Sequence, residues 1–172
     1  MTTVTKNEAT SRSAVLTLPS DTQIQIVREF AAPKHLVFRA YTTPELISRW
    51  WTSKRGAMRV CEVDLRVGGT WRYVMDADGG FEVGFHGEYR EIVTNERIVY
   101  TEVFEGAPVA PGEEEVPTLN TLTLSEHDGR TTLTLVTECG TRELRDIIIE
   151  SGMEGGMQDG FDLLEQVAVS LS

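Results

Sequence analysis

Positive charge is scarce in this chain. Lys and Arg number 16 against 27 Asp and Glu, which gives a formal net charge of −11 at pH 7. Such a surface repels phosphate backbones and acidic lipid headgroups, so we expect neither nucleic acid nor a membrane as a partner. No apolar run approaches the ~20 residues of a membrane span, and the first twenty residues lack the apolar core of a signal peptide. We therefore expect a cytoplasmic protein, as a monomer or a homodimer.

Cysteine, histidine and nucleotide-binding motifs are also sparse or absent. The two cysteines, Cys61 and Cys139, do not form a CxxC pair. We expect them to be free, small buried side chains rather than a disulfide. The histidines His35, His86 and His127 fall in separate predicted elements, so we expect no metal site. The chain has no G-x-S-x-G, Walker or dinucleotide-binding motif, and we expect no cofactor.

The length and composition favour one globular domain. A chain of 172 residues, 40% hydrophobic and 25% charged, can form a single stable core. Residues 1–13 are polar and rich in Thr and Ser, so we expect a flexible N-terminal segment there. We expect residues 14–172 to form the single domain.

Helical patterns occupy two regions. Pro33 and the following apolar spacing predict one helix, and Thr43-Pro44-Glu45 predicts a second, with Thr43 as its cap. Trp50 and Trp51 would extend the apolar face of the second helix. In the tail, Met157, Phe161, Leu164, Ala168 and Leu171 share one helical face and predict a long C-terminal helix. Gly152, Gly155 and Gly156 interrupt the helical pattern before it, and we expect a break or a flexible joint there.

Strand patterns fill the rest of the chain. A strand is predicted over 24–30, with a start as early as 14–18. Six more follow, over 58–65, 70–77, 81–93, 97–104, 119–125 and 131–138. Short Gly- or Asn-containing turns separate most of them. The connection over 105–117 is acidic and predicts a solvated loop or, alternatively, a lid. The order of elements predicts an α+β fold, an antiparallel sheet with helices on one face.

Four segments together resemble a known family. They are Trp50-Trp51 after the Thr-Pro-Glu helix start, GGTWRY at 68–73, GEYREI at 87–92 and ERIVYT at 96–101. With the C-terminal amphipathic helix, they resemble the activator of Hsp90 ATPase homologue 1-like family of the START-like (SRPBCC) superfamily, over about residues 24–171. The resemblance implies a helix-grip fold, in which a curved antiparallel sheet wraps around the long last helix and encloses a cavity.

Strand pairing can be predicted from the turns. A two-residue turn at 94–95 pairs Glu91 with Ile98, Tyr89 with Tyr100, Gly87 with Glu102 and Phe85 with Phe104. A three-residue loop at 78–80 pairs Met75 with Val83, Tyr73 with Phe85 and Trp71 with Gly87. A turn at 128–129 pairs Leu124 with Leu133, Leu122 with Leu135 and Asn120 with Thr137. All three registers gather large apolar groups on one face, which is how a register is normally specified.

A few polar residues share this inward face, and Gly87 leaves a gap between Trp71 and Glu102. An apolar space with a few placed polar groups is typical of a ligand pocket. The predicted cavity residues are Trp51, Trp71, Tyr73, Phe85, Gly87, Tyr89, Glu91, Tyr100, Glu102, Asn120 and Thr137.

Each of these residues also has a structural interpretation. Gly87 could mark a bend whose gap Trp71 fills, and the three tyrosines could be ordinary core. Glu102 could lie at the mouth, or a bulge could turn it outward. Trp50 and Trp51 cannot both face inward on one helix, so one of them should be partly exposed.

Three functions remain open. The leading hypothesis is a binding protein that holds a small apolar or amphipathic ligand between the sheet and the last helix, and that is not a conventional enzyme. The family resemblance offers an Hsp90-type chaperone as an alternative partner. The third is a cyclase-like enzyme that uses Glu91 or Glu102 as acid or base.

Overall fold

The computed structural model describes residues 13–105 and 116–172. The strands are β1 (Val15–Thr17), β2 (Gln23–Phe30), β3 (Gly56–Val63), β4 (Thr70–Ala77), β5 (Phe81–Val93), β6 (Arg97–Glu105), β7 (Thr118–His127) and β8 (Arg130–Glu138). The helices are α2 (Lys34–Thr42), α3 (Pro44–Ile47), α4 (Arg142–Glu150) and α5 (Met153–Ser170). All but the last residue of the predicted flexible segment at 1–13 and most of the predicted loop at 105–117 lie outside the described residues.

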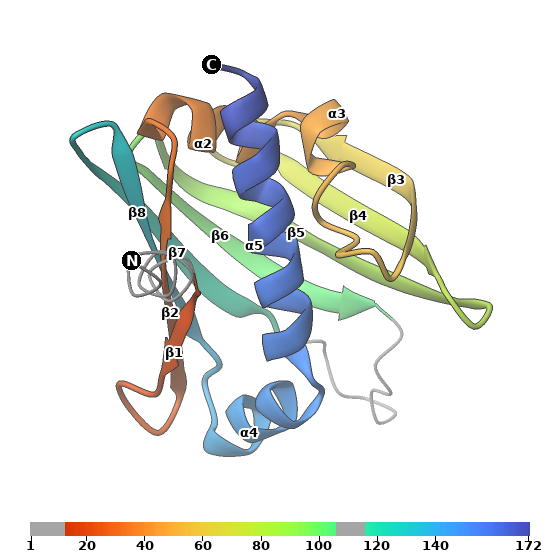
Figure 1. Cartoon of the computed structure of the whole chain (residues 1–172). Helices are drawn as coiled ribbons and strands as arrows, with labels where there is room; N and C mark the ends of the chain where they lie inside the picture. The colour runs from red at the N-terminus through yellow and green to blue at the C-terminus, as the bar shows by residue number, and fades with distance from the viewer. Residues whose placement is uncertain (1–12, 106–115) are drawn as a thin grey trace, which may run out of the picture.

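Across the described residues, eight strands form one antiparallel sheet in the order β1-β2-β8-β7-β6-β5-β4-β3. The sheet is curved, and α5 lies across its concave face (Figure 1). Helices α2 and α3 lie at one end of α5, and α4 lies at the other. This arrangement confirms the predicted α+β class, with the last helix held by the sheet.

Turn chemistry sets two of the registers as predicted. Asp128 and Gly129 both have positive φ, as the two-residue turn between β7 and β8 requires, and Leu124 pairs with Leu133. The three-residue loop after β4 pairs Trp71 with Gly87.

The turn between β5 and β6 differs from the prediction. It contains three residues, because Val93 pairs with Arg97. A bulge between Tyr89 and Glu91 then restores the predicted pairing of Tyr89 with Tyr100. The extra residue reverses the direction of the side chains beyond it, so Glu91 pairs with Val99 rather than with Ile98.

The helices depart from their predicted bounds in four ways. Pro33 precedes α2 instead of opening it. The second helix, α3, ends at Ile47, so both tryptophans lie in the turns beyond it. Thr43 occupies the N-cap position of α3, but its hydroxyl makes no capping hydrogen bond. In the tail, Ser151 and the left-handed Gly152 (φ 84°) separate α4 from α5, whereas Gly155 and Gly156 lie inside α5.

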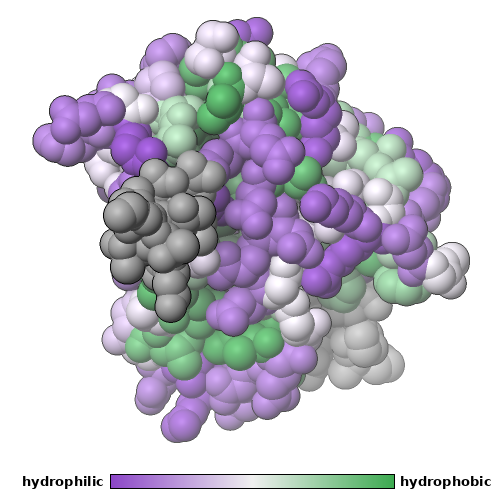
Figure 2. All heavy atoms as spheres, in the orientation of Figure 1, coloured by the Kyte–Doolittle hydropathy of each residue, from purple (hydrophilic) through white to green (hydrophobic). Residues whose placement is uncertain are grey.

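The core lies between the sheet and the inner face of α5. On α5, Phe161, Leu164 and Ala168 are all buried, as the helical spacing predicts. Phe161 packs edge-on against Phe30 of β2 with ring centroids 5.8 Å apart. The opposite face of α5 is hydrophilic, whereas apolar side chains reach the surface toward α4 (Figure 2). The predicted amphipathic character of this helix is therefore confirmed.

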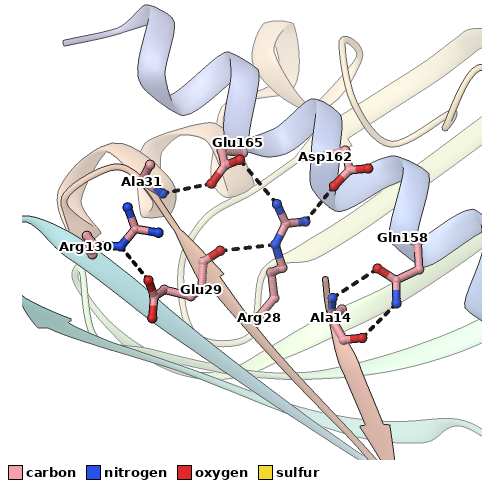
Figure 3. A network of polar contacts seen from close by, with 8 residues as sticks. All are labelled: Ala14, Arg28, Glu29, Ala31, Arg130, Gln158, Asp162 and Glu165. Atoms are coloured by element: carbon pink, nitrogen blue, oxygen red, sulfur yellow. Dashed lines mark hydrogen bonds and ion pairs between the residues drawn. The ribbon is translucent and has the colours of Figure 1, made fainter. Parts of the chain in front are cut away.

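A polar cluster attaches α5 to the β2 side of the sheet (Figure 3). Arg28 of β2 is 1% exposed, and its guanidinium contacts Asp162 at 3.0 Å and Glu165 at 3.3 Å. Glu165 also accepts a hydrogen bond of 2.9 Å from the backbone N–H of Ala31. One turn before Asp162 on α5, the amide of Gln158 makes two hydrogen bonds to the backbone of Ala14. These contacts fix the position of α5 over the sheet, and with it the space underneath.

Candidate functional site

A cavity of about 1300 Å³ lies between the concave face of the sheet, α4 and α5. Its walls are largely apolar and include residues from β2, from β4 to β8, from α2, α4 and α5, and from the turns after α3. Of the predicted residues, the following line it: Trp51, Trp71, Tyr73, Phe85, Tyr89, Tyr100, Glu102, Asn120 and Thr137. Gly87 and Glu91 do not.

The aromatic residues form a continuous wall. The ring of Trp71 packs 4.7 Å from that of Tyr73 and 5.7 Å from that of Tyr100. Trp51 packs edge-on against Tyr73 and Phe85, with centroids 5.4 and 5.7 Å apart. The wall spans β4, β5, β6 and the turn after α3, so only the folded sheet brings it together.

The two adjacent tryptophans divide as expected. Trp50 is 6% exposed, and its indole N–H donates a hydrogen bond of 2.9 Å to the carbonyl of Ala40. Trp51 is only half-buried. Both side chains reach the cavity wall, because the chain turns after α3 instead of continuing as a helix.

Gly87 was predicted to leave a pocket, and this prediction is wrong. A Cβ atom at this position would lie 1.8 Å from the carbonyl oxygen of Thr101 on β6. The Trp71 indole covers the same spot and donates a hydrogen bond of 3.2 Å to that oxygen. The glycine therefore permits close approach of two strands and an indole, which is the structural interpretation of this residue.

Glu91 was predicted to face the cavity, and this is also wrong. The β5 bulge turns its side chain to the outer face, where it is 47% exposed and lies 3.4 Å from the Nε atom of Arg97. Glu102 remains on the inner face. The two carboxylates therefore lie on opposite sides of the sheet and cannot act as an acid–base pair on one substrate.

Glu102 is a carboxyl group held inside the cavity wall. Among residues 13–105 and 116–172, no side chain forms an ion pair or a hydrogen bond with its carboxylate. Burial raises its pKa from 4.5 to about 7, because desolvation disfavours the charged form. Its side chain keeps some accessible surface because it faces the cavity. Near neutral pH this group can therefore both bind and release a proton.

Asn120 supplies a second polar group. It is 3% exposed on β7, and its amide oxygen accepts a hydrogen bond of 2.6 Å from the hydroxyl of Thr137 on β8. Its amide nitrogen has no hydrogen-bond partner among the described residues. Because the Thr137 hydroxyl can donate or accept, either orientation of the amide leaves one end unpaired. An unpaired buried polar group costs about 1–3 kcal/mol, which a ligand would relieve.

Several cavity residues were not identified from the sequence. The hydroxyl of Tyr41 on α2 lies 3.2 Å from that of Tyr100, and burial raises the pKa of Tyr41 to about 12. Its spacing with Leu36, Val37 and Ala40 on one helical face was the available signal. At the surface, Phe81, Phe104 and Ile147 line the cavity yet are 60%, 47% and 63% exposed. No local pattern distinguishes such rim residues from others on the surface.

Both cysteines are free. Cys139 is buried, as expected, whereas Cys61 is only half-buried. Of the described helices, none combines the length and the apolarity needed to cross a membrane.

The family model for activator of Hsp90 ATPase homolog 1-like protein matches residues 31–168. No curated protein shows significant similarity to the chain.

Solved structures share the fold over almost the whole chain. A protein from Rhodobacter sphaeroides superposes with a TM-score of 0.81 at 24% identity, covering 91% of this chain and 99% of that one. A protein from Nitrosomonas europaea gives a TM-score of 0.77 at 26% identity, with coverages of 90% and 98%. A protein from Chromobacterium violaceum gives 0.67 at 29% identity, with coverages of 86% and 95%. The curved sheet and its last helix are thus a helix-grip fold.

Proposed function

Because this chain belongs to the activator of Hsp90 ATPase homolog 1-like family, whose START-like fold is a ligand-binding fold in general, we propose that it binds a small apolar or amphipathic molecule in its cavity. The observation that carries the proposal is the amide nitrogen of Asn120, which has no partner among the described residues and lies within a largely apolar wall. A pocket of this kind uses apolar area for affinity and a few polar groups for orientation.

The arrangement of the wall supports this proposal. The cavity has a volume of about 1300 Å³, which is larger than the ~300–1,000 Å³ usual for small-molecule pockets. The exposed apolar rim formed by Phe81, Phe104 and Ile147 gives an apolar molecule a compatible entrance. Apolar side chains that are exposed around a cavity mark ligand or partner sites more often than scattered ones do.

Filling the cavity should weaken binding of a neutral probe. Leu135 of β8 lines the cavity, whereas its neighbour Val136 points to the outer face of the same strand. We expect Leu135→Trp to weaken binding of the neutral dye Nile red about tenfold, because the added ring atoms occupy ligand space at a cost of about 1–3 kcal/mol. Val136→Trp, the matched control, should leave binding unchanged. Fluorescence titration measures both.

Native mass spectrometry of gently purified protein gives an independent reading. A retained small molecule would appear as mass above that of the chain. Absence of Nile red binding to the wild-type protein would overturn the proposal. So would equal weakening by both tryptophan variants, since that result would place the dye outside the cavity.

A further inference from the structure

The cavity wall contains one carboxyl group, and that group has no ion-pair partner among the described residues. Glu102 brings a carboxyl group, and neither α4 nor α5 contributes a titratable side chain to the wall. The phenol groups of Tyr41, Tyr73 and Tyr100 lie near this carboxyl, whose charge adds to the effect of burial in raising their pKa values. The described wall therefore places phenol groups near Glu102 but no cation within ion-pair distance of it.

The cavity wall also contains an arginine, Arg55, but its guanidinium does not pair with Glu102 in the described part of the chain. Arg55 lines the cavity but is exposed, and its guanidinium packs against α5, where a Cβ at Gly155 would lie 3.1 Å from it. No ion pair joins Arg55 to Glu102 within the described part of the chain. The carboxylate is thus available to a positively charged group that enters the cavity.

Aromatic rings surround the same space. Trp71 packs against both Tyr73 and Tyr100. Tyr100 and Glu102 are two residues apart on β6, so their side chains lie on one face of the sheet. Aromatic faces attract cations by about 0.5–2 kcal/mol each, and recognition of organic ammonium groups uses such walls. A net charge of −11 also raises the local concentration of cationic ligands and lowers that of anionic ones.

We propose that the cavity selects an organic cation: an amphipathic amine whose ammonium group pairs with Glu102 against the aromatic wall, and whose apolar body extends toward the rim. A hydroxyl or carbonyl group on the same molecule would satisfy the amide of Asn120. This inference rests on the proposed function, because it requires the cavity to be the binding site. It excludes free fatty acids and other anionic amphiphiles as preferred ligands.

Three amphiphiles of equal chain length separate charge from apolar area. Isothermal titration calorimetry at pH 8 would use decylamine, 1-decanol and decanoate below their aggregation concentrations. For the wild-type protein we expect decylamine to bind at least tenfold more tightly than decanol, and decanoate to bind most weakly. In Glu102→Gln, which keeps the shape but loses the charge, decylamine should bind no more tightly than decanol. Decanol affinity should stay within about twofold of wild type.

A matched variant controls for net charge. Glu88 lies on β5 with its side chain 45% exposed on the outer face of the sheet. Glu88→Gln removes the same unit of charge and should leave the amine preference intact. Loss of the preference in Glu88→Gln would overturn the inference, because general electrostatic attraction would then explain it. Equal binding of all three amphiphiles would also overturn it, while leaving the proposed function in place. Absence of binding by all three would overturn both.

The pH dependence provides a further test. Decylamine remains protonated between pH 6 and 8, as an alkylamine with a pKa near that of Lys, about 10.4. The tyrosines that face Glu102 from α2, β4 and β6 do not titrate in this range, because their pKa values lie above 10. Amine affinity of the wild-type protein should therefore rise as pH increases from 6 to 8, and that of Glu102→Gln should not. A flat wild-type profile would overturn the pairing with Glu102.

Discussion

Arg28→Ala is expected to lower the free energy of unfolding by about 3–5 kcal/mol, the usual cost of breaking a buried ion pair from one side. The substitution leaves Glu165, whose side chain is 13% exposed, without its guanidinium partner. It also removes the cation that lies 5.0 Å from the ring centroid of Phe30. Urea denaturation followed by circular dichroism measures the loss.

Two further variants separate the ion pair from simple truncation. Arg59 forms ion pairs with Asp76 and Glu82, but all three side chains are about half-exposed, so Arg59→Ala should stay close to wild type. The double variant Arg28→Met with Glu165→Gln should recover much of the loss, because neither side chain then buries an unpaired charge. A loss below about 1 kcal/mol in Arg28→Ala would show that the cluster does not hold α5 in place.

Glu102→Gln is expected to stabilise the protein, and the gain should grow with pH. The folded-state pKa of Glu102 is about 7, above its ordinary value of 4.5. Between these values the folded state binds more protons than the unfolded state, so the wild-type free energy of unfolding falls as pH rises through this window. The fall amounts to up to about 3 kcal/mol and is complete above pH 7. Glutamine cannot ionise, so the variant does not undergo this loss of stability.

The measurement is a pair of thermal or urea unfolding series from pH 4.5 to 8. The two proteins should be equally stable near pH 4.5, and the variant should be more stable at pH 8. Glu105, three residues along β6, is the control with the opposite sign. Arg72 and His86 on the outer face hold its pKa at about 2, so Glu105→Gln should destabilise the protein at pH 7. Parallel pH profiles for wild type and Glu102→Gln would contradict the assigned burial of Glu102.

Glu102 and Glu91 show how much the alternation of side chains along a strand could predict. Counting residues from the predicted turns placed Glu102, Tyr100 and Asn120 on the inner face, where the structure also has them. The same count failed for Glu91, because a bulge after Tyr89 reverses the alternation. A bulge depends on how two strands fit together, so the sequence of one strand does not reveal it.

Gly87 shows a different limit. The sequence predicted that Trp71 and this glycine are cross-strand neighbours, and the pairing is confirmed. Whether the space between them stays open depends on the third strand, β6, whose Thr101 carbonyl lies where a Cβ atom would be. A pairwise register cannot reveal a contact among three strands.

In the helical tail, too, the sequence predicted one feature correctly and another wrongly. The apolar spacing of Phe161, Leu164 and Ala168 was enough to predict which face of α5 is buried. Gly155 and Gly156 suggested a break but lie within the helix, because tertiary packing can outweigh the roughly 1 kcal/mol by which glycine disfavours helix.

By itself the sequence determined the class of the fold, most strand registers and the buried face of the last helix, because these follow from short-range periodicity and turn chemistry. Only the tertiary structure decided which inward-facing groups surround a cavity and which fill the core. That distinction depends on the curvature of the sheet and on the separation between the sheet and α5. The contacts of Arg28 with Asp162 and Glu165 set this separation. Neither property is carried by any single segment of the chain.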